Sequence, residues 1–304
     1  MIFHFDALGT PNPRFPVTMM CRLLEVSTSG YYAWRARVDC PPAPATPRGR
    51  RAQITTHVKE LFHGHNGFAG ARTIHRQLRR EGIATTLYAV RVIMSQEHLI
   101  TKYRRPFKRT TIPDPKAAAR TDLLQRNFQP PVATTHLCGD ITYLRTGQGW
   151  MYLATVIDLT TRMVVGWQIA DRMTSQLVVD ALAMAYHAGY VAGNAIFHSD
   201  RGSQYTSQHF TRIAAQMDVR LSVGETRVCW DNAVAESLFS TLKLHLLFDR
   251  KQFPTKFAAR FETGQWIETY YNRQRPHSAT GTVPADAMHQ FFARHNDHPP
   301  NSAA

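Results

Sequence analysis

The chain has 304 residues, of which 43% are hydrophobic and 19% charged, so it is long and apolar enough to fold into two or three domains. Apolar runs stay below the roughly 18 residues of a membrane span, and the start, MIFHFDALGTPNPRF, lacks the order of a secretory signal peptide. Cys21, Cys40, Cys138 and Cys229 form no CxxC pair, which argues against a disulfide framework or a zinc knuckle and favours the cytoplasm.

Basic residues are concentrated in the first part of the chain. Residues 1–132 hold 21 Lys and Arg against 8 Asp and Glu, whereas residues 133–304 hold 15 against 14, within a net charge of +14. Such segregation is typical of a nucleic-acid-binding arm joined to a nearly neutral working domain. Solubility alone is the alternative explanation, but the segregation favours nucleic acid.

Residues 1–49 are expected to form a helical segment followed by a linker. Apolar residues recur at helical spacing within 16–37, and Ser27 or Thr28 is suited to cap a second short helix there. Four prolines in the stretch 39–49 indicate the linker.

Residues 50–132 are predicted to form a basic, all-helical, helix-turn-helix-like DNA-binding region and a further linker. Helices are expected at 72–80 and 87–98, with another before a glycine-rich turn at 63–70. One helix face carries arginines suited to phosphates, unless it is an ordinary solvated face: Arg72, Arg76, Arg79 and Arg80.

His63 and His65 raise the question of a metal site in this region. No Cys or His pair follows them at zinc-finger spacing. We therefore expect a plain loop at these positions.

Residues 133–250 are predicted to form an α/β domain with a mixed sheet, and residues 251–304 a C-terminal helical extension. The first three strands have short turns between them, which indicates an antiparallel meander. The order β-β-β-α-β-α-β-α is typical of a mixed sheet with helices on its faces. Strands are expected at 137–144, 150–158, 163–170, 195–200 and 219–223.

Three acids in this domain are candidates for one catalytic site. Asp140 lies inside the first strand, where an acid is disfavoured without a partner or a metal, Asp200 ends the fourth strand, and Glu236 lies on the last helix. If the first and fourth strands are neighbours, the three carboxylates converge and repel each other unless divalent cations neutralise them. Mg²⁺ prefers carboxylate oxygen and water, and two such ions would activate a water or a 3′-hydroxyl for phosphoryl transfer.

Each of these acids also has a purely structural interpretation. Asp140 would be a salt-bridged strand residue, Asp200 a turn residue and Glu236 a solvated helix residue. Taken together with the basic arm, the three acids favour the metal site. Asp158, which fits a hairpin turn, and Asp171, which ends a strand, are weaker candidates.

Several segments resemble, in order and spacing, the transposases of two-reading-frame bacterial insertion sequences, and more narrowly the second-frame product (OrfB) of the IS-three family. The segments include GDITYL, FHSDRGSQYTS, CWDNAVAESLFSTLK and YYNRQRPHS, and the resemblance covers roughly residues 16–290. It implies a ribonuclease H-like core, similar to retroviral integrases, with a DDE signature. This core is expected between the helix-turn-helix-like region and C-terminal helices.

The resemblance carries over residue by residue. Asp140 and Asp200 match the two aspartates and Glu236 the glutamate, which implies that they bind two Mg²⁺ ions, with Mn²⁺ as a substitute. The 35 residues between Asp200 and Glu236 match the family spacing. DNA contacts are expected at a basic helix position, at the loop beside the second aspartate and in a C-terminal motif: Lys243, Ser203, Gln204, Asn272, Arg273, Arg275 and His277. A helix-capping loop is the alternative for that C-terminal motif.

The expected function is that of a DDE recombinase that cleaves DNA at terminal inverted repeats and joins the 3′ ends to a target, in the bacterial cytoplasm at the nucleoid. A catalytically inactive DNA-binding regulator or relic, or a ribonuclease H-like nuclease, is the alternative. Expected partners are double-stranded DNA, further copies of the chain on DNA, and an upstream-frame (OrfA) partner or fusion, with no membrane.

Overall fold

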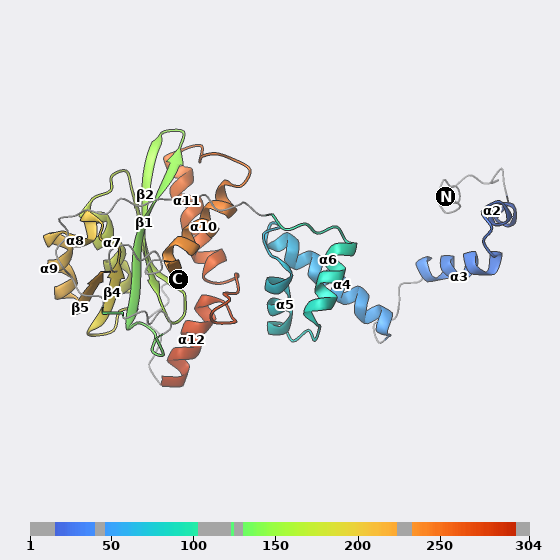
Figure 1. Ribbon diagram of the computed structural model, residues 1–304, viewed down its shortest axis with the longest axis horizontal. Coiled ribbons are helices and arrows are strands. Elements are labelled where there is room, and N and C mark those ends of the chain that lie inside the picture. The colour runs from blue at the N-terminus through green and yellow to red at the C-terminus, as the bar shows by residue number, and fades with distance from the viewer. Residues whose placement is uncertain (1–15, 40–45, 103–122, 125–129, 224–232, 296–304) are drawn as a thin grey trace.

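A five-stranded mixed sheet in the order β3-β2-β1-β4-β5 forms the centre of the larger part of the protein (Figure 1). The computed structural model describes residues 16–39, 46–102, 123–124, 130–223 and 233–295. The strands are β1 (His136–Thr146), β2 (Gly149–Asp158), β3 (Val164–Ala170), β4 (Ala195–Ser199) and β5 (Val219–Val223).

The strand directions place β1 at the middle of the sheet. β1 pairs antiparallel with β2, and β2 antiparallel with β3, so the first three strands form the predicted meander. On its other side β1 pairs in parallel with β4, which pairs in parallel with β5. At Gly139 a Cβ atom would collide with the Phe197 ring on β4, so only glycine lets these two strands pair this closely.

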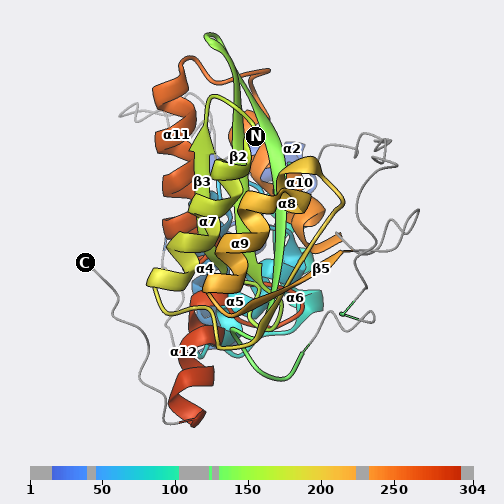
Figure 2. The same ribbon diagram turned by 90° about the vertical axis from the view of Figure 1, so that its left-hand side faces the viewer.

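Helices cover both faces of the sheet, and β1 is buried on both. Leu137 and Ile141 pack toward α7 and α9, while Cys138 and Leu144 pack toward α10 and α11, as strand alternation requires. In Figure 2, α7, α8 and α9 lie in front of the sheet. The helices of this part are α7 (Ser175–His187), α8 (Ser203–Thr206), α9 (Gln208–Gln216), α10 (Ala233–Leu247), α11 (Lys256–Gln265), η1 (Trp266–Tyr271) and α12 (Pro284–His295).

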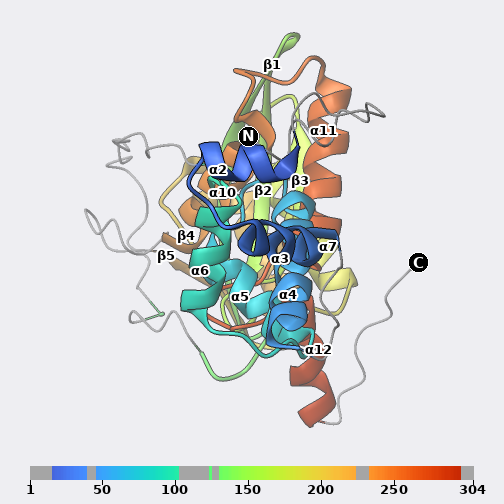
Figure 3. The same ribbon diagram turned by 90° about the vertical axis from the view of Figure 1, so that its right-hand side faces the viewer.

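A separate helical bundle precedes the sheet and has its own apolar core. It consists of α4 (Pro47–Gly64), α5 (Ala71–Arg80) and α6 (Leu87–Gln96), and it faces the viewer in Figure 3. Thr46 caps α4 by accepting from the Gly49 N–H at 3.0 Å, and Thr86 caps α6 by accepting from the Ala89 N–H at 3.1 Å. The core is apolar at helical spacing: Val58, Phe62, Ile74, Leu78, Val90, Ile93 and Met94.

Two further helices, α2 (Val17–Leu23) and α3 (Thr28–Asp39), lie near the start of the chain. They pack on each other around the buried Cys21 and Tyr31. Ser27 caps α3, because its hydroxyl accepts from the Gly30 N–H at 3.0 Å, as expected from the sequence. None of the helices in the described ranges has the length and apolar character that a membrane crossing requires.

The predicted meander and mixed sheet are confirmed, with two differences in the helices. A short helix, α8, lies between β4 and α9 and was not expected. Within the predicted C-terminal helical extension, α11 changes at Trp266 into the π-helical η1, which ends with the Asn272 N–H donating to the Ile267 carbonyl. Gly264, just before this change, lets the helix lie close to the Trp167 ring, where a Cβ would stand 2.8 Å from the indole.

Candidate active site

Asp140 and Asp200 are brought together by the parallel pairing of β1 with β4. The last paired residues are Gly139 and Ser199, and the next residue on each chain segment is an aspartate. Paired residues on neighbouring strands project from the same face of a sheet, about 5 Å apart. The two carboxylates therefore leave the sheet side by side, on the face that α10 covers.

Backbone groups orient both carboxylates. Asp140 Oδ1 accepts from the Ile141 N–H at 2.8 Å, and Asp200 Oδ1 accepts from the Gly202 N–H at 2.9 Å. A Cβ atom at Gly202 would stand 2.9 Å from Asp200 Oδ1, so the loop needs glycine to pass this close to the carboxylate. Both acids are half-buried, so each can be reached from solvent.

A buried thiol and a buried phenol, those of Cys138 and Tyr205, lie close enough to the two acids to feel their charge. Burial raises the pKa of the Cys138 thiol, and the negative charges of Asp140 and Asp200 raise it further. Burial also raises the pKa of Tyr205 well above its usual value, again with contributions from Asp140 and Asp200. Both groups therefore stay protonated at neutral pH and add no negative charge to the site.

Neither Cys138 nor Tyr205 was predicted from the sequence, although the position of Cys138 offered a signal. Cys138 lies two residues before Asp140, so strand alternation points both side chains to one face. Tyr205 lies on α8, a helix that was not expected from the sequence.

Glu236 lies in the first turn of α10, and its side chain is exposed. The preceding residue, Ala235, is buried and forms a backbone hydrogen bond with the Cys138 thiol, so the start of α10 packs on β1 beside Asp140. Within the described ranges, no three His, Cys, Asp or Glu side chains stand close enough together to hold a metal ion. The structure thus joins the two aspartates and leaves Glu236 near them at the surface. Asp231 and Asn232, which precede α10 in the sequence and are residue types suited to cap it, lie outside the described residues.

The donor set suits a hard cation. Two adjacent carboxylates repel each other, and a divalent ion with oxygen ligands removes that repulsion. Asp140 and Asp200 fit Mg²⁺ or Mn²⁺ by this chemistry, and the exposed Glu236 lies in the first turn of the helix that packs on the same strand.

Three of the expected DNA contacts follow one of the three acids within a few residues in the sequence. Ser203 and Gln204 begin α8 directly after the loop that holds Asp200. Ser203 is exposed, while the Gln204 Nε2 donates to the Met173 carbonyl at 3.3 Å. Lys243 is half-buried on α10, two turns after Glu236.

The basic face of α5 is divided between solvent and the sheet-containing part. Arg72 and Arg79 are exposed. Arg80 forms an ion pair with Asp286 on α12 at 2.9 Å. The positive charge of Arg76 is one of those that lower the pKa of His277. Only part of the predicted phosphate-binding face is therefore open to a ligand.

The C-terminal motif residues lie where the two parts of the protein meet. Asn272 is buried, and its amide both accepts from the Val164 N–H and donates to the Val164 carbonyl, each at 3.0 Å. Asn272 therefore lies inside the protein, where it holds the backbone of β3, and not on a surface that DNA could contact. Arg275 lies over the Tyr271 ring at 5.9 Å, and Arg273 is exposed.

Histidines link the helical bundle to α10 and η1. His65, which was expected in a plain loop, caps α4, donates from Nε2 to Gln77 Oε1 at 2.8 Å and accepts at Nδ1 from the Tyr270 hydroxyl at 2.9 Å. His245 stacks on Phe68 of the bundle with 4.3 Å between the ring centres. Its Nδ1 accepts from Trp266 Nε1 at 3.2 Å.

These contacts require neutral imidazoles. Burial, followed by the charge of Arg275, lowers the pKa of His245 to about 3 and that of His277 to about 4. Burial also lowers the pKa of His65. The junction between the bundle and the sheet-containing part is therefore sensitive to acid.

Comparisons with known proteins agree with this arrangement. Two families, both described as Integrase core domain, match residues 131–229 and 217–284, and the HTH-like domain family matches residues 50–107. The transposase InsF for insertion sequence IS3A of Escherichia coli (strain K12) is 34% identical over 270 residues, covering 88% of this chain and 91% of that protein.

Two solved structures are also similar, at low sequence identity. A chain of the simian T-cell lymphotropic virus intasome in complex with PP2A regulatory subunit B56 gamma has a TM-score of 0.45 at 16% identity, covering 76% of this chain and 74% of that one. The HTLV-2 integrase catalytic core domain in complex with magnesium (trimeric form) has a TM-score of 0.42 at 15% identity, covering 52% of this chain and 99% of that one.

Acidification should weaken the junction. Because the His245 pKa is about 3 in the folded protein and 6.5 without burial, stability is lost as the pH falls below 6.5 and the unfolded chain gains a proton. The loss is at most about 1.4 kcal/mol per pH unit for each such histidine. We expect His245→Asn to be less stable at neutral pH but to lose stability less steeply between pH 6.5 and 4.

Urea unfolding of both proteins across this pH range measures the effect. Asn keeps an acceptor for the Trp266 indole without a titrating group. Equal pH slopes for the wild type and the variant would contradict the assignment of a neutral, buried His245.

Proposed function

The chain belongs to the IS3 family of transposases, and we propose that it cleaves DNA at the terminal inverted repeats of its insertion sequence and joins the 3′ ends to a target. It has an integrase catalytic core and is thus a polynucleotidyl transferase of the DDE class. The observation that carries the proposal is the placement of Asp140 beside Asp200 by the β1–β4 pairing.

We assign Asp140, Asp200 and Glu236 as ligands of two Mg²⁺ ions. Glu236 is included because the backbone of its neighbour Ala235 forms a hydrogen bond with Cys138, which lies on the same strand as Asp140. Bound Mg²⁺ would supply Lewis-acid activation of a water or 3′-hydroxyl and stabilise the leaving oxygen. The Ile141 and Gly202 N–H groups hold the carboxylates in orientation, and the neutral Cys138 and Tyr205 add no charge that would compete for the cation.

We assign binding of the DNA ends to the helical bundle. Its match to the HTH-like domain family and its exposed Arg72 and Arg79 support this role. Arg76 acts electrostatically on His277, and Arg80 is exposed but paired with Asp286, so both would reach phosphates only beside that junction.

Residues near the catalytic acids would guide the DNA into the site. Lys243, Ser203 and Gln204 are proposed to contact the strand that is cut. Arg273, Arg275 and His277 border the junction and would contact the flanking backbone. Joining two element ends also implies that at least two copies act together on DNA, alone or with an upstream-frame partner.

The catalytic assignment is tested by replacing the acids one at a time. With Mg²⁺ and labelled DNA carrying the element's own ends, we expect Asp140→Asn, Asp200→Asn and Glu236→Gln each to lose cleavage and strand transfer by at least about a thousandfold while still binding the DNA. A change of this size is about 4 kcal/mol in the barrier. Asp180→Asn, at an acid on α7 hydrogen-bonded to Gln176, serves as the matched control and should retain activity.

Other outcomes would redirect the proposal. Turnover in EDTA would contradict the metal mechanism. Cleavage without new joints would indicate a nuclease. DNA binding without cleavage by the wild type, even when fused to its first-frame segment, would indicate a regulator or a relic.

The DNA-binding assignment predicts that Arg72→Ala and Arg79→Ala each weaken binding several-fold and reduce the slope of log affinity against log salt by about 1, because each removes one phosphate contact. Binding measured across a salt series checks this. Arg212→Ala, at an exposed arginine on α9, is the control. An unchanged salt slope in both bundle variants would contradict a phosphate role for α5.

A further inference from the structure

Among the described residues, two ion pairs join the helical bundle to the sheet-containing part, and both have the same polarity. Arg80, the last residue of α5, lies 2.9 Å from Asp286 Oδ2 in the first turn of α12. Lys102 Nζ lies 3.7 Å from Asp249 Oδ2, between α10 and α11. The Lys102 N–H donates to the Gly67 carbonyl at 2.9 Å, which holds this lysine on the bundle. In both pairs the bundle supplies the cation and the sheet-containing part supplies the acid.

Neutral contacts also dock the two parts on each other. The Tyr270 hydroxyl lies 2.9 Å from His65 Nδ1, and the Phe68 ring stacks on that of His245. Packed aromatic rings contribute more than the area that they bury, whereas exposed ion pairs add little to stability. Docking alone therefore gives no reason for acids to hold two cations of the bundle.

Both partners of the Arg80–Asp286 pair are open to solvent. The side chain of Arg80 is 41% exposed and that of Asp286 is 39% exposed. A guanidinium presents the same fork of N–H donors to a carboxylate and to a phosphate. Asp286 therefore holds Arg80 in the way that a DNA phosphate would, at a place that a phosphate can reach.

The surroundings of this pair are positively charged. The charges of Arg275 and of Arg76, on α5, both lower the pKa of His277, so cations from both parts of the protein lie close together here. Arg80 follows Arg76 by one turn of α5. A DNA backbone at the junction would meet this group of cations, and Arg80 joins the group once it leaves Asp286.

We propose that Asp286 and Asp249 compete with DNA phosphates for Arg80 and Lys102, so that the junction is an autoinhibitory contact in the DNA-free protein. The inference rests on the proposed function, because it takes the bundle as the part that binds DNA. Binding exchanges a carboxylate for a phosphate at each of the two cations. One such exchange alone gains little, since it breaks one charged contact to make another.

This exchange limits non-specific binding by a chain whose net charge is +14. The exposed Arg72 and Arg79 bind phosphates without first leaving an acid. A duplex that lies against them brings further phosphates to Arg80, the residue after Arg79, at a high effective concentration. DNA that engages the whole of α5 therefore displaces Asp286, and DNA that meets Arg80 alone does not.

A double-mutant cycle on Arg80 and Asp286 tests the competition. The full chain is titrated with a labelled duplex carrying the element's end, in Ca²⁺, whose looser coordination permits binding without productive cleavage. We expect Asp286→Asn to tighten binding about two- to fivefold, because an exposed ion pair no longer has to be broken; fivefold is about 1 kcal/mol. In a chain that carries Arg80→Ala, Asp286→Asn should leave the affinity unchanged.

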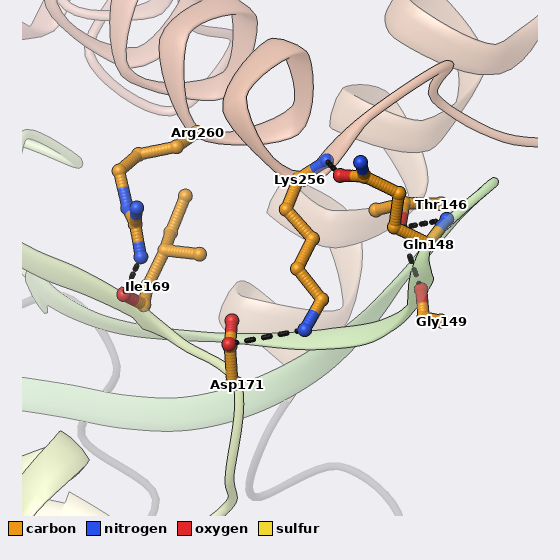
Figure 4. Close-up of polar contacts among 7 residues, drawn as sticks. All are labelled: Thr146, Gln148, Gly149, Ile169, Asp171, Lys256 and Arg260. Atoms are coloured by element: carbon orange, nitrogen blue, oxygen red, sulfur yellow. Dashed lines mark hydrogen bonds and ion pairs between the residues drawn. The ribbon is translucent and has the colours of Figure 1, made fainter.

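Lys256 and Asp171 provide the matched control. Their ion pair, at 3.0 Å, lies at the start of α11 and involves no residue of the bundle (Figure 4). Asp171→Asn removes the same charge as Asp286→Asn and thus measures the general effect of a lost acid on DNA binding. We expect it to bind DNA as the wild type does.

The second ion pair gives an independent cycle. Asp249→Asn should tighten binding less than Asp286→Asn does, because its pair with Lys102 is longer and the Asp249 side chain is 78% exposed. This effect, too, should vanish in a chain that carries Lys102→Ala. The second cycle decides the question if thermal unfolding shows that Asp286→Asn does not fold.

Three results would overturn the inference. Unchanged affinity of Asp286→Asn would make the ion pair a docking contact only. A gain that persists in the Arg80→Ala chain would be general electrostatics, and weaker binding would mean that the docked junction assists DNA. Failure of the proposed function is recognised separately with a duplex of unrelated sequence. Phosphate competition gives the same cycle on both duplexes, whereas a chain that does not recognise its element's end binds both equally.

Discussion

The in-register pairing of β1 with β4 is the constraint on which the rest of the account depends. It places two aspartates, 60 positions apart in sequence, side by side at the point where the strands stop pairing. Like charges at this separation are unfavourable unless a cation joins them. The close approach is possible because Gly139 has no side chain to collide with Phe197. The buried groups near the acids, Cys138 and Tyr205, are neutral and add no further repulsion.

Helix α10 contacts both the sheet that bears the two aspartates and the helical bundle. Its first turn bears Glu236 and packs on β1, and its last turn bears His245, which stacks on Phe68 of the helical bundle. The bundle that we assign to DNA therefore contacts the same helix that carries the third acid. Contacts at the junction, such as the hydrogen bond of His65 with Tyr270, fix where the exposed Arg72 and Arg79 lie relative to the catalytic face.

The sequence predicted the strands well, because alternation and β-branched runs are local signals. It also placed Asp200 at a strand end. The convergence of the acids depended on the first and fourth strands being neighbours, and the structure meets that condition. It did not reveal the role of Asn272, whose amide clamps Val164, 108 residues away, since no local pattern encodes such a contact. The same holds for His65, which meets a partner 205 residues away. The arginines on α5 were predicted as one basic face, and only tertiary packing divides Arg80, paired with Asp286, from Arg72 and Arg79. The roles assigned to the acids and to the DNA contacts remain predictions.

The most direct measurement is the anomalous scattering of Mn²⁺ in crystals of the full chain bound to DNA that carries the element's end. The account predicts peaks between the carboxylates of Asp140 and Asp200, with Glu236 joined to them as a ligand. Mn²⁺ accepts the same oxygen ligands as Mg²⁺ and is therefore a fair substitute. A complex with the DNA end at these residues but no peak there, or with the metal held by other side chains, would contradict the account.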